Sequence, residues 1–103
     1  MGIKQETISA MYETKIGAAL FKAGYRLYAD GHWRRTIDSA GCGLSPAEQK
    51  INAQGGRDYG TDANVILSRE IADAKARLDG FADDEIEASI ELYWLRDWLN
   101  DAT

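Results

Sequence analysis

The chain has 103 residues, of which 28% are charged and 45% hydrophobic, with a single proline, cysteine and histidine. A chain of this length can bury a sufficient core without a metal or a disulfide, so we expect one globular domain over residues 1–103. The longest uncharged apolar stretch, residues 16–21, is far shorter than the roughly 18 residues of a membrane-spanning helix. Because one cysteine cannot form an internal disulfide, a reducing cytoplasm is the expected location.

The net charge of −5 is distributed unevenly along the chain. Residues 1–37 carry six cations and three acids, a net charge of +3, whereas residues 38–103 carry six cations and fourteen acids, a net charge of −8. The acidic part would repel a phosphate backbone from any broad contact. The charge distribution therefore disfavours direct binding to nucleic acid. Binding to a basic protein, with no membrane involved, is the simpler expectation.

The first predicted element is an amphipathic helix. Ile8, Tyr12 and Ile16 begin a series of apolar residues that recur every three or four positions through residues 5–23. Gly24 follows at the place where helices commonly end with a residue in the left-handed conformation. The pattern predicts one uninterrupted helix up to this glycine.

A β-hairpin is predicted next, in residues 25–37. Asp30 and Gly31 form a strong hairpin signal, because aromatic and β-branched residues flank them on both sides. A two-residue type I′ turn at this pair would place Tyr28 beside Trp33 across the strands. The competing interpretation continues the first helix through Tyr28 to a cap at Gly31. It stays open because two lone strands are only marginally stable without a helix to pack against.

Two further helices are predicted from capping signals and periodicity. Ser45, Pro46 and Glu48 combine an N-cap residue, a proline at the first helical position and a glutamate at the third. After a segment rich in turn residues, a third helix is expected between Asp62 and Gly80, because its apolar residues form a regular stripe.

The last predicted helix begins near residue 83 and is apolar on two sides. At 100° per residue one face holds three leucines, and another face is an aromatic arc made of Ile86, Ile90, Tyr93, Trp94 and Trp98. The leucine face is the cleaner core candidate because it contains no charge, which would leave the aromatic arc for a partner. The competing interpretation wedges this helix between two others and buries both faces.

These elements predict a mainly α fold: a small bundle of about four helices, with one short hairpin over residues 25–37 packed on it. The stripes of the helices define the expected core. It consists of Ile8, Tyr12, Ile16, Leu67, Ile71, Leu78, Leu92, Leu95 and Leu99.

No group of residues has the spacing of a catalytic or metal site. Cys42 lies between two glycines before a helix start, where a thiol pKa can be lowered, but nothing in the sequence places His32 beside it as a base. A calcium loop would need a glutamate where Arg69 stands, and a phosphate loop would need a lysine that is absent. We therefore predict no catalytic residues, no metal and no cofactor.

Two surfaces are candidates for binding another macromolecule. The first lies on the last helix, where acidic and aromatic side chains suit a basic partner groove; its residues are Asp84, Glu87, Glu91, Trp94 and Trp98. The second lies in the hairpin, where aromatic residues alternate with cations as in single-stranded nucleic-acid platforms; its residues are Arg26, Tyr28, Trp33, Arg34 and Arg35.

The sequence favours a small acidic, non-enzymatic binding or inhibitor protein that occupies a basic surface of a partner, such as a nucleic-acid-handling protein. In physical character alone it is similar to small phage inhibitors that disarm CRISPR or restriction systems, an analogy that rests on no shared motif. The alternatives are a homo-oligomeric assembly component, a homodimer included, that uses the aromatic face, and a nucleic-acid-binding module that uses residues 25–35.

Overall fold

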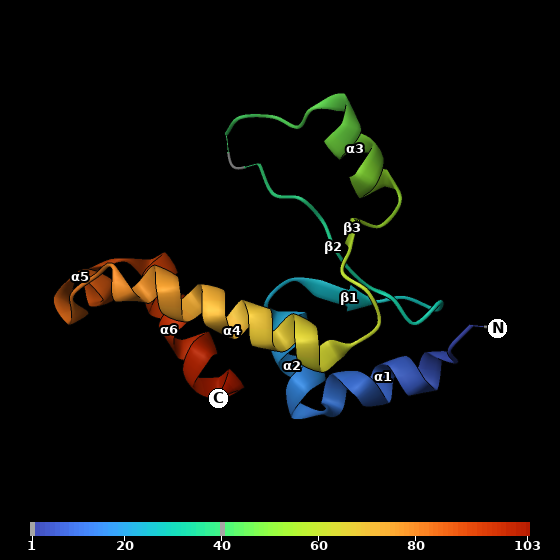
Figure 1. Cartoon of the computed structure of the whole chain (residues 1–103), viewed down its shortest axis with the longest axis horizontal. Helices are drawn as coiled ribbons and strands as arrows, with labels where there is room; N and C mark the ends of the chain where they lie inside the picture. The colour runs from blue at the N-terminus through green and yellow to red at the C-terminus, as the bar shows by residue number, and fades with distance from the viewer. Residues whose placement is uncertain (1, 40) are drawn as a thin grey trace.

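A computed structural model describes residues 2–39 and 41–103, and its fold is mainly helical (Figure 1). Three short strands form an antiparallel sheet in the order β1-β2-β3. In chain order the elements are α1 (Gln5–Glu13), α2 (Lys15–Lys22), β1 (Tyr25–Leu27), β2 (Trp33–Arg35), α3 (Pro46–Ala53), β3 (Arg57–Asp58), α4 (Ala63–Asp79), α5 (Asp83–Ala88) and α6 (Ile90–Ala102). The predicted class, a helical bundle with a short β segment, is confirmed, with six helices in the described residues because two of the predicted four are broken.

Helix α2 lies at the centre of the packing, in contact with α1, α4, α6 and β1. Its Leu20 is fully buried, and the rings of Tyr25 and Trp33 from the hairpin are 1% and 2% exposed. These are the largest fully buried side chains, and burial of such aromatic rings dominates the stability of a small core. The hairpin is therefore part of the core and not an addition to it.

The predicted core is only partly correct. Among its nine residues, Ile8, Leu67 and Leu92 are buried. The remaining six are half-buried: Tyr12, Ile16, Ile71, Leu78, Leu95 and Leu99. Of these, Tyr12, Ile16 and Ile71 pack against the central cluster. Stripe geometry selects residues within helices, so it missed Tyr25 and Trp33, which lie on strands.

The first predicted helix is broken at Thr14, which has extended backbone angles. The Thr14 hydroxyl accepts a hydrogen bond from the Gly17 N–H at 3.0 Å and donates to the Met11 carbonyl at 2.6 Å. One side chain thus caps the start of α2 and the end of α1. Position 17 must be glycine, because a Cβ atom there would lie 1.9 Å from the Met11 carbonyl oxygen.

The hairpin is confirmed, but its predicted register is wrong by one residue. Leu27 pairs with Trp33, and the Tyr28 N–H donates to the His32 carbonyl at 3.0 Å, so Tyr28 faces His32 and not Trp33. The loop has three residues and ends at Gly31, which has a φ of 85°. Asp30 keeps a negative φ, which excludes a type I′ turn and favours the three-residue loop that ends in a left-handed glycine.

For residues 57–62 the sequence pattern predicts only turns. In the structure Arg57 and Asp58 form the third strand and pair with Arg35 and Arg34. Beyond the strand the Tyr59 N–H donates to the Trp33 carbonyl at 2.9 Å. A two-residue strand is too short for an alternating pattern, so the sequence carries no signal for it.

The start signals of α3 and α4 are confirmed. The Ser45 hydroxyl accepts from the Glu48 N–H at 3.3 Å, and the Glu48 carboxylate accepts from the Ser45 N–H at 3.1 Å, which is a complete capping box. Asp62 caps α4 by accepting from two backbone N–H groups, and Gly80 follows its last residue.

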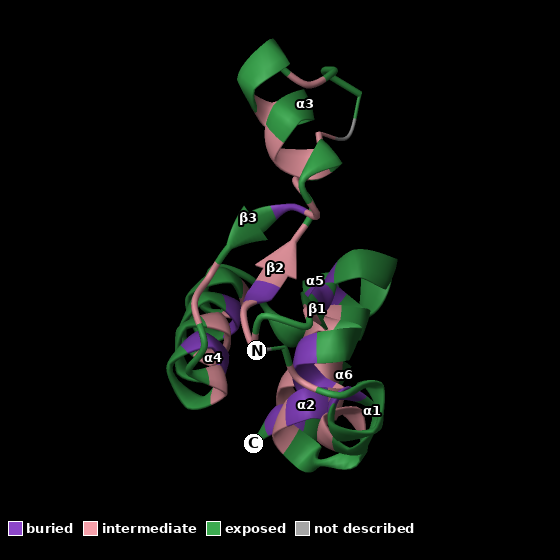
Figure 2. Ribbon diagram, turned by 90° about the vertical axis from the view of Figure 1, so that its right-hand side faces the viewer, coloured by how far each residue is buried: buried purple, intermediate pink, exposed green. Residues whose placement is uncertain are grey.

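Residues 36–39 and 41–56 project from the other helices as an arm that carries α3 (Figure 2). Helix α3 has no buried residue. The Asn52 side chain holds the base of the arm, accepting from the Ile37 N–H at 2.8 Å and donating to the Ile37 carbonyl at 3.1 Å, and the Tyr28 hydroxyl donates to the Gly55 carbonyl at 3.0 Å. The radius of gyration is 15.2 Å, against about 13 Å for a compact domain of this length.

The last predicted helix is broken at Ser89, whose backbone is extended and whose side chain accepts from the Leu92 N–H at 3.4 Å. On one continuous helix Ile86 would point to the same side as Tyr93. The break turns α5 so that Ile86 is 5% exposed, whereas Tyr93 is 48% exposed. None of the helices in the described part of the chain has the length and apolar character needed to cross a membrane.

Candidate protein-binding surface

The aromatic residues of the hairpin are largely enclosed by the fold. Trp33 is buried, with its ring 6.1 Å from the Tyr12 ring in an edge-on arrangement. The Tyr28 ring is half-buried beneath the Arg34 guanidinium, 4.9 Å from the ring centroid. Trp33 therefore has no open face on which a nucleic-acid base would stack, and Arg34 lies over one face of Tyr28.

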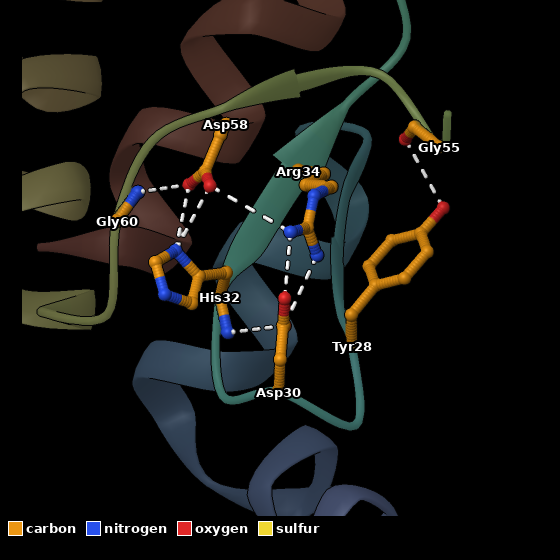
Figure 3. Close-up of polar contacts among 7 residues, drawn as sticks. All are labelled: Tyr28, Asp30, His32, Arg34, Gly55, Asp58 and Gly60. Carbon is orange, nitrogen blue, oxygen red and sulfur yellow. Dashed lines mark hydrogen bonds and ion pairs between the residues drawn. The ribbon is translucent and has the colours of Figure 1, made fainter. Parts of the chain in front are cut away.

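The Arg34 guanidinium lies at the centre of a polar network on the sheet (Figure 3). Its two terminal nitrogens donate to both Asp30 carboxylate oxygens at 3.0 and 2.7 Å, and one of them lies 3.6 Å from Asp58. Asp58 also contacts the His32 ring nitrogen Nδ1 at 2.9 Å and accepts from the Gly60 N–H at 2.7 Å. A bidentate arginine in such a network has few donors left for a phosphate.

This network lowers the pKa values of both carboxyl groups. The hydrogen bonds from Arg34, followed by the His32 backbone N–H, hold the pKa of Asp30 far below its usual range. The Gly60 N–H and then the His32 ring lower the pKa of Asp58. Hydrogen bonds to a carboxylate stabilise its charged form. Both acids therefore stay ionised and keep Arg34 paired.

The other two hairpin arginines are also engaged. Arg35 lies 3.3 Å from the Glu70 carboxylate and over the Tyr25 ring, and the Tyr25 hydroxyl donates to the same carboxylate. Burial of Tyr25 and its bond to Glu70 raise the pKa of this phenol well above its ordinary value. Arg26 donates to the Phe21 and Tyr25 carbonyls and lies 3.8 Å from the Phe21 ring centroid. All three arginines thus stabilise the fold itself.

Helix α6 differs, because it leaves large apolar side chains exposed. Ile90 is 67%, Trp94 65% and Tyr93 48% exposed. Together with the exposed Asp97 they form one side of the helix, which we call the α6 outer face. Exposed apolar groups gathered on one surface and bordered by polar residues are typical of a protein interaction site.

Trp98 has a different role from Trp94, although both were predicted as partner-binding residues. It is half-buried, packs against the core, and its indole N–H donates to the Ala19 carbonyl of α2 at 2.8 Å. A buried indole N–H needs such a partner. Trp98 therefore fastens α6 to α2, whereas Trp94 projects from the outer face.

The three acidic residues of the predicted surface are distributed over both C-terminal helices. Asp84 and Glu87 belong to α5, before the Ser89 break, and Glu91 lies in the first turn of α6. The Glu87 and Glu91 side chains are 66% and 82% exposed and form only loose ion pairs, 3.8 Å from Arg96 and 3.6 Å from Arg77. Residues 83–103 carry seven acids and one cation. Lys22 and Arg77 from other helices contact Asp101 and Glu91, so the C-terminal helices keep an excess of negative charge that is compensated only in part.

Ile90 and Tyr93 were predicted to lie on the aromatic arc but were left out of the list of partner-binding residues. Their position on the aromatic arc was visible in the helical periodicity, but periodicity does not show which half of the arc the rest of the fold covers. Cys42 is exposed in the arm, and His32 contacts Asp58 on the sheet. In the described residues no three His, Cys, Asp or Glu side chains gather as a metal site would require.

These contacts make the α6 outer face the surface best suited to recognition of another protein. Comparisons with protein-family models, with curated proteins and with solved structures find no match to this chain.

Proposed function

We propose that this chain is a small acidic binding protein that acts by covering a basic surface of a partner protein and so inhibits what that surface does. The observation that carries the proposal is the α6 outer face, on which Ile90, Tyr93 and Trp94 are exposed beside an excess of carboxylates. Removing such side chains from water is a main source of affinity in protein interfaces, and tryptophan and tyrosine are enriched among the residues that matter most.

Charge supports a basic partner. With seven acids against one cation in residues 83–103, this surface attracts Lys and Arg side chains and repels phosphate. Complementary charge increases the rate of association and selects the partner, while the buried aromatic side chains slow dissociation. A protein that handles nucleic acid has a basic groove of this kind, and an acidic occupant would compete with the nucleic acid for it.

The proposal is tested by capture of partners from the native host with wild-type and variant chains. We expect a basic protein to be retained by the wild type, and Trp94→Ala to weaken its binding by about 2 kcal/mol or more, roughly thirtyfold. Phe81→Ala is the matched control, because Phe81 is another exposed aromatic, 42% exposed, outside the α6 outer face. The captured protein should also lose its nucleic acid when this chain is added.

Two results would contradict the proposal. Equal retention by wild type and Trp94→Ala would show that the α6 outer face does not bind the partner. The second result would come from light scattering. A wild-type chain that is a stable dimer and a Trp94→Ala variant that is a monomer would identify the α6 outer face as a self-association surface. We expect a monomer, because two copies of so acidic a surface repel one another.

A further inference from the structure

A groove of about 450 Å³ runs between α4 and α6, next to the α6 outer face. Helix α4 contributes Glu70, Asp73, Ala74 and Arg77, and α6 contributes Glu91, Trp94, Leu95 and Trp98. Each set has the spacing of one helix face, with intervals of three, four and seven residues. The two helices therefore present matching faces to the same groove, and its volume lies within the range of ligand sites.

The ends of the groove are set by its ion pairs. Arg77 contacts Glu91 at 3.6 Å across one end. At the other end Arg35 is paired with Glu70 at 3.3 Å, and the Trp98 indole is bonded to α2. Because the helices run antiparallel between these contacts, Asp73 and Trp94 occupy the middle of the groove from opposite walls.

Asp73 is the charge that the groove leaves uncompensated. The groove cations are Lys22, Arg35 and Arg77, and each contacts another carboxylate: Asp101 at 3.9 Å, Glu70 and Glu91. Within the described residues no cation lies within 4 Å of Asp73. A free carboxylate and an exposed indole that line the same groove suit a planar cation, since a guanidinium can stack on the ring and donate to the carboxylate.

We infer that the groove receives an arginine side chain of the partner, held between the Trp94 indole and the Asp73 carboxylate. This rests on the proposed function, because Trp94 both lines the groove and projects from the α6 outer face, so one partner segment would cover both. Arginine is favoured over lysine because its guanidinium is flat, weakly hydrated and able to form two parallel hydrogen bonds to one carboxylate. Glu91 would strengthen the site if the incoming arginine displaced Arg77.

The test uses two peptides of equal charge, hexa-arginine and hexa-lysine, titrated into the ¹⁵N-labelled full chain. We expect the arginine peptide to bind about five to ten times more tightly and to shift the Trp94 indole N–H signal. Asp73→Asn should remove this preference. Asp79→Asn is the matched control, because it makes the same charge change on an exposed position of the same helix outside the groove, and it should keep the preference.

The outcomes separate this inference from the proposed function. Equal affinity for both peptides, or equal effects of Asp73→Asn and Asp79→Asn, would overturn the arginine site and leave only attraction by net charge. A captured partner that is lost with Trp94→Ala but retained with Asp73→Asn would support the proposed function and overturn the groove inference. In the third outcome, Asp73→Asn removes the preference for the arginine peptide, but no captured protein is lost with Trp94→Ala. This outcome would overturn the proposed function alone.

Discussion

Trp33 in the hairpin is 2% exposed, whereas Trp94 on α6 is 65% exposed. Charged residues surround both, but Arg34 beside Trp33 is paired with Asp30 and Asp58. The C-terminal helices hold seven acids and only one cation of their own, and their ion pairs with Arg96, Arg77 and Lys22 are loose. The hairpin has charges of both signs within reach and can neutralise itself. The C-terminal helices are neutralised only in part, because three of their seven acids have a cation within 4 Å. An aromatic and charged segment is therefore a candidate binding surface only if the fold itself does not use those groups.

The largest expected effect compares the two tryptophans. Trp33→Ala should lower the free energy of unfolding by about 3 to 5 kcal/mol, because it leaves a cavity at the centre of the core. Trp94→Ala should change it by no more than about 0.5 kcal/mol, as at other exposed positions. Urea denaturation followed by circular dichroism measures both. Similar losses from the two variants would show that α6 buries its outer face.

Charge reversal tests the other half of the comparison. We expect Glu87→Lys with Glu91→Lys to slow association with the captured partner about tenfold and to weaken its dependence on salt, because these exposed acids steer the encounter. The double change Glu6→Lys with Glu13→Lys alters the net charge equally on exposed positions of α1. If both double variants slow association to the same extent, the net charge of the chain determines the association rate and the position of the acids on the C-terminal helices does not.

The hairpin network predicts a loss of stability in acid. The folded-state pKa values of Asp30 and Asp58 are lower than the ordinary value of 3.8, so the unfolded chain binds protons first as the pH falls. Their contribution is present above about pH 4 and is lost progressively below it. The urea concentration at the midpoint of unfolding should fall as the pH is lowered from 7 to 2, and it should fall less steeply for the Asp58→Asn variant. If the urea midpoint of this variant depends on pH as steeply as that of the wild type, the ion pairs of Asp58 do not contribute to stability.

The smallest expected effect is on nucleic-acid binding. Because Trp33 is buried and the hairpin arginines are paired, single- and double-stranded oligonucleotides should not be retained in a gel-shift assay at physiological salt. Retention that disappears with Arg34→Ala and Arg35→Ala would reverse the comparison and make the hairpin the functional surface.

Local signals predicted much of the fold, because helix starts and ends are determined by neighbouring residues. The Ser45 capping box and the end of α4 at Gly80 are examples. The breaks at Thr14 and Ser89 were missed, since the apolar periodicity continues across both. Each break reorients a short helix so that both halves bury an apolar residue, and this advantage exists only in the assembled core.

The candidate surface could be predicted in outline but not in detail. The aromatic arc and its acids follow from the spacing on one helix. The different roles of Trp94 and Trp98 depend on where the Ala19 carbonyl lies, 79 residues away in the chain. The groove depends on α4 facing α6, and the sequence of each helix contains no information on which other helix it meets.

The arm formed by residues 36–39 and 41–56 has a consequence for how the molecule unfolds. Its helix α3 buries no residue. The two Asn52 hydrogen bonds close the arm on itself at Ile37, and the Tyr28 hydroxyl joins it to the hairpin; each such bond contributes about 1 kcal/mol. We therefore expect the arm to unfold as a separate cooperative unit, and to open far more often than the core. Native-state hydrogen exchange would be fast in α3 and slow in α2, and a protease would cut the arm while α6 and its outer face stay folded.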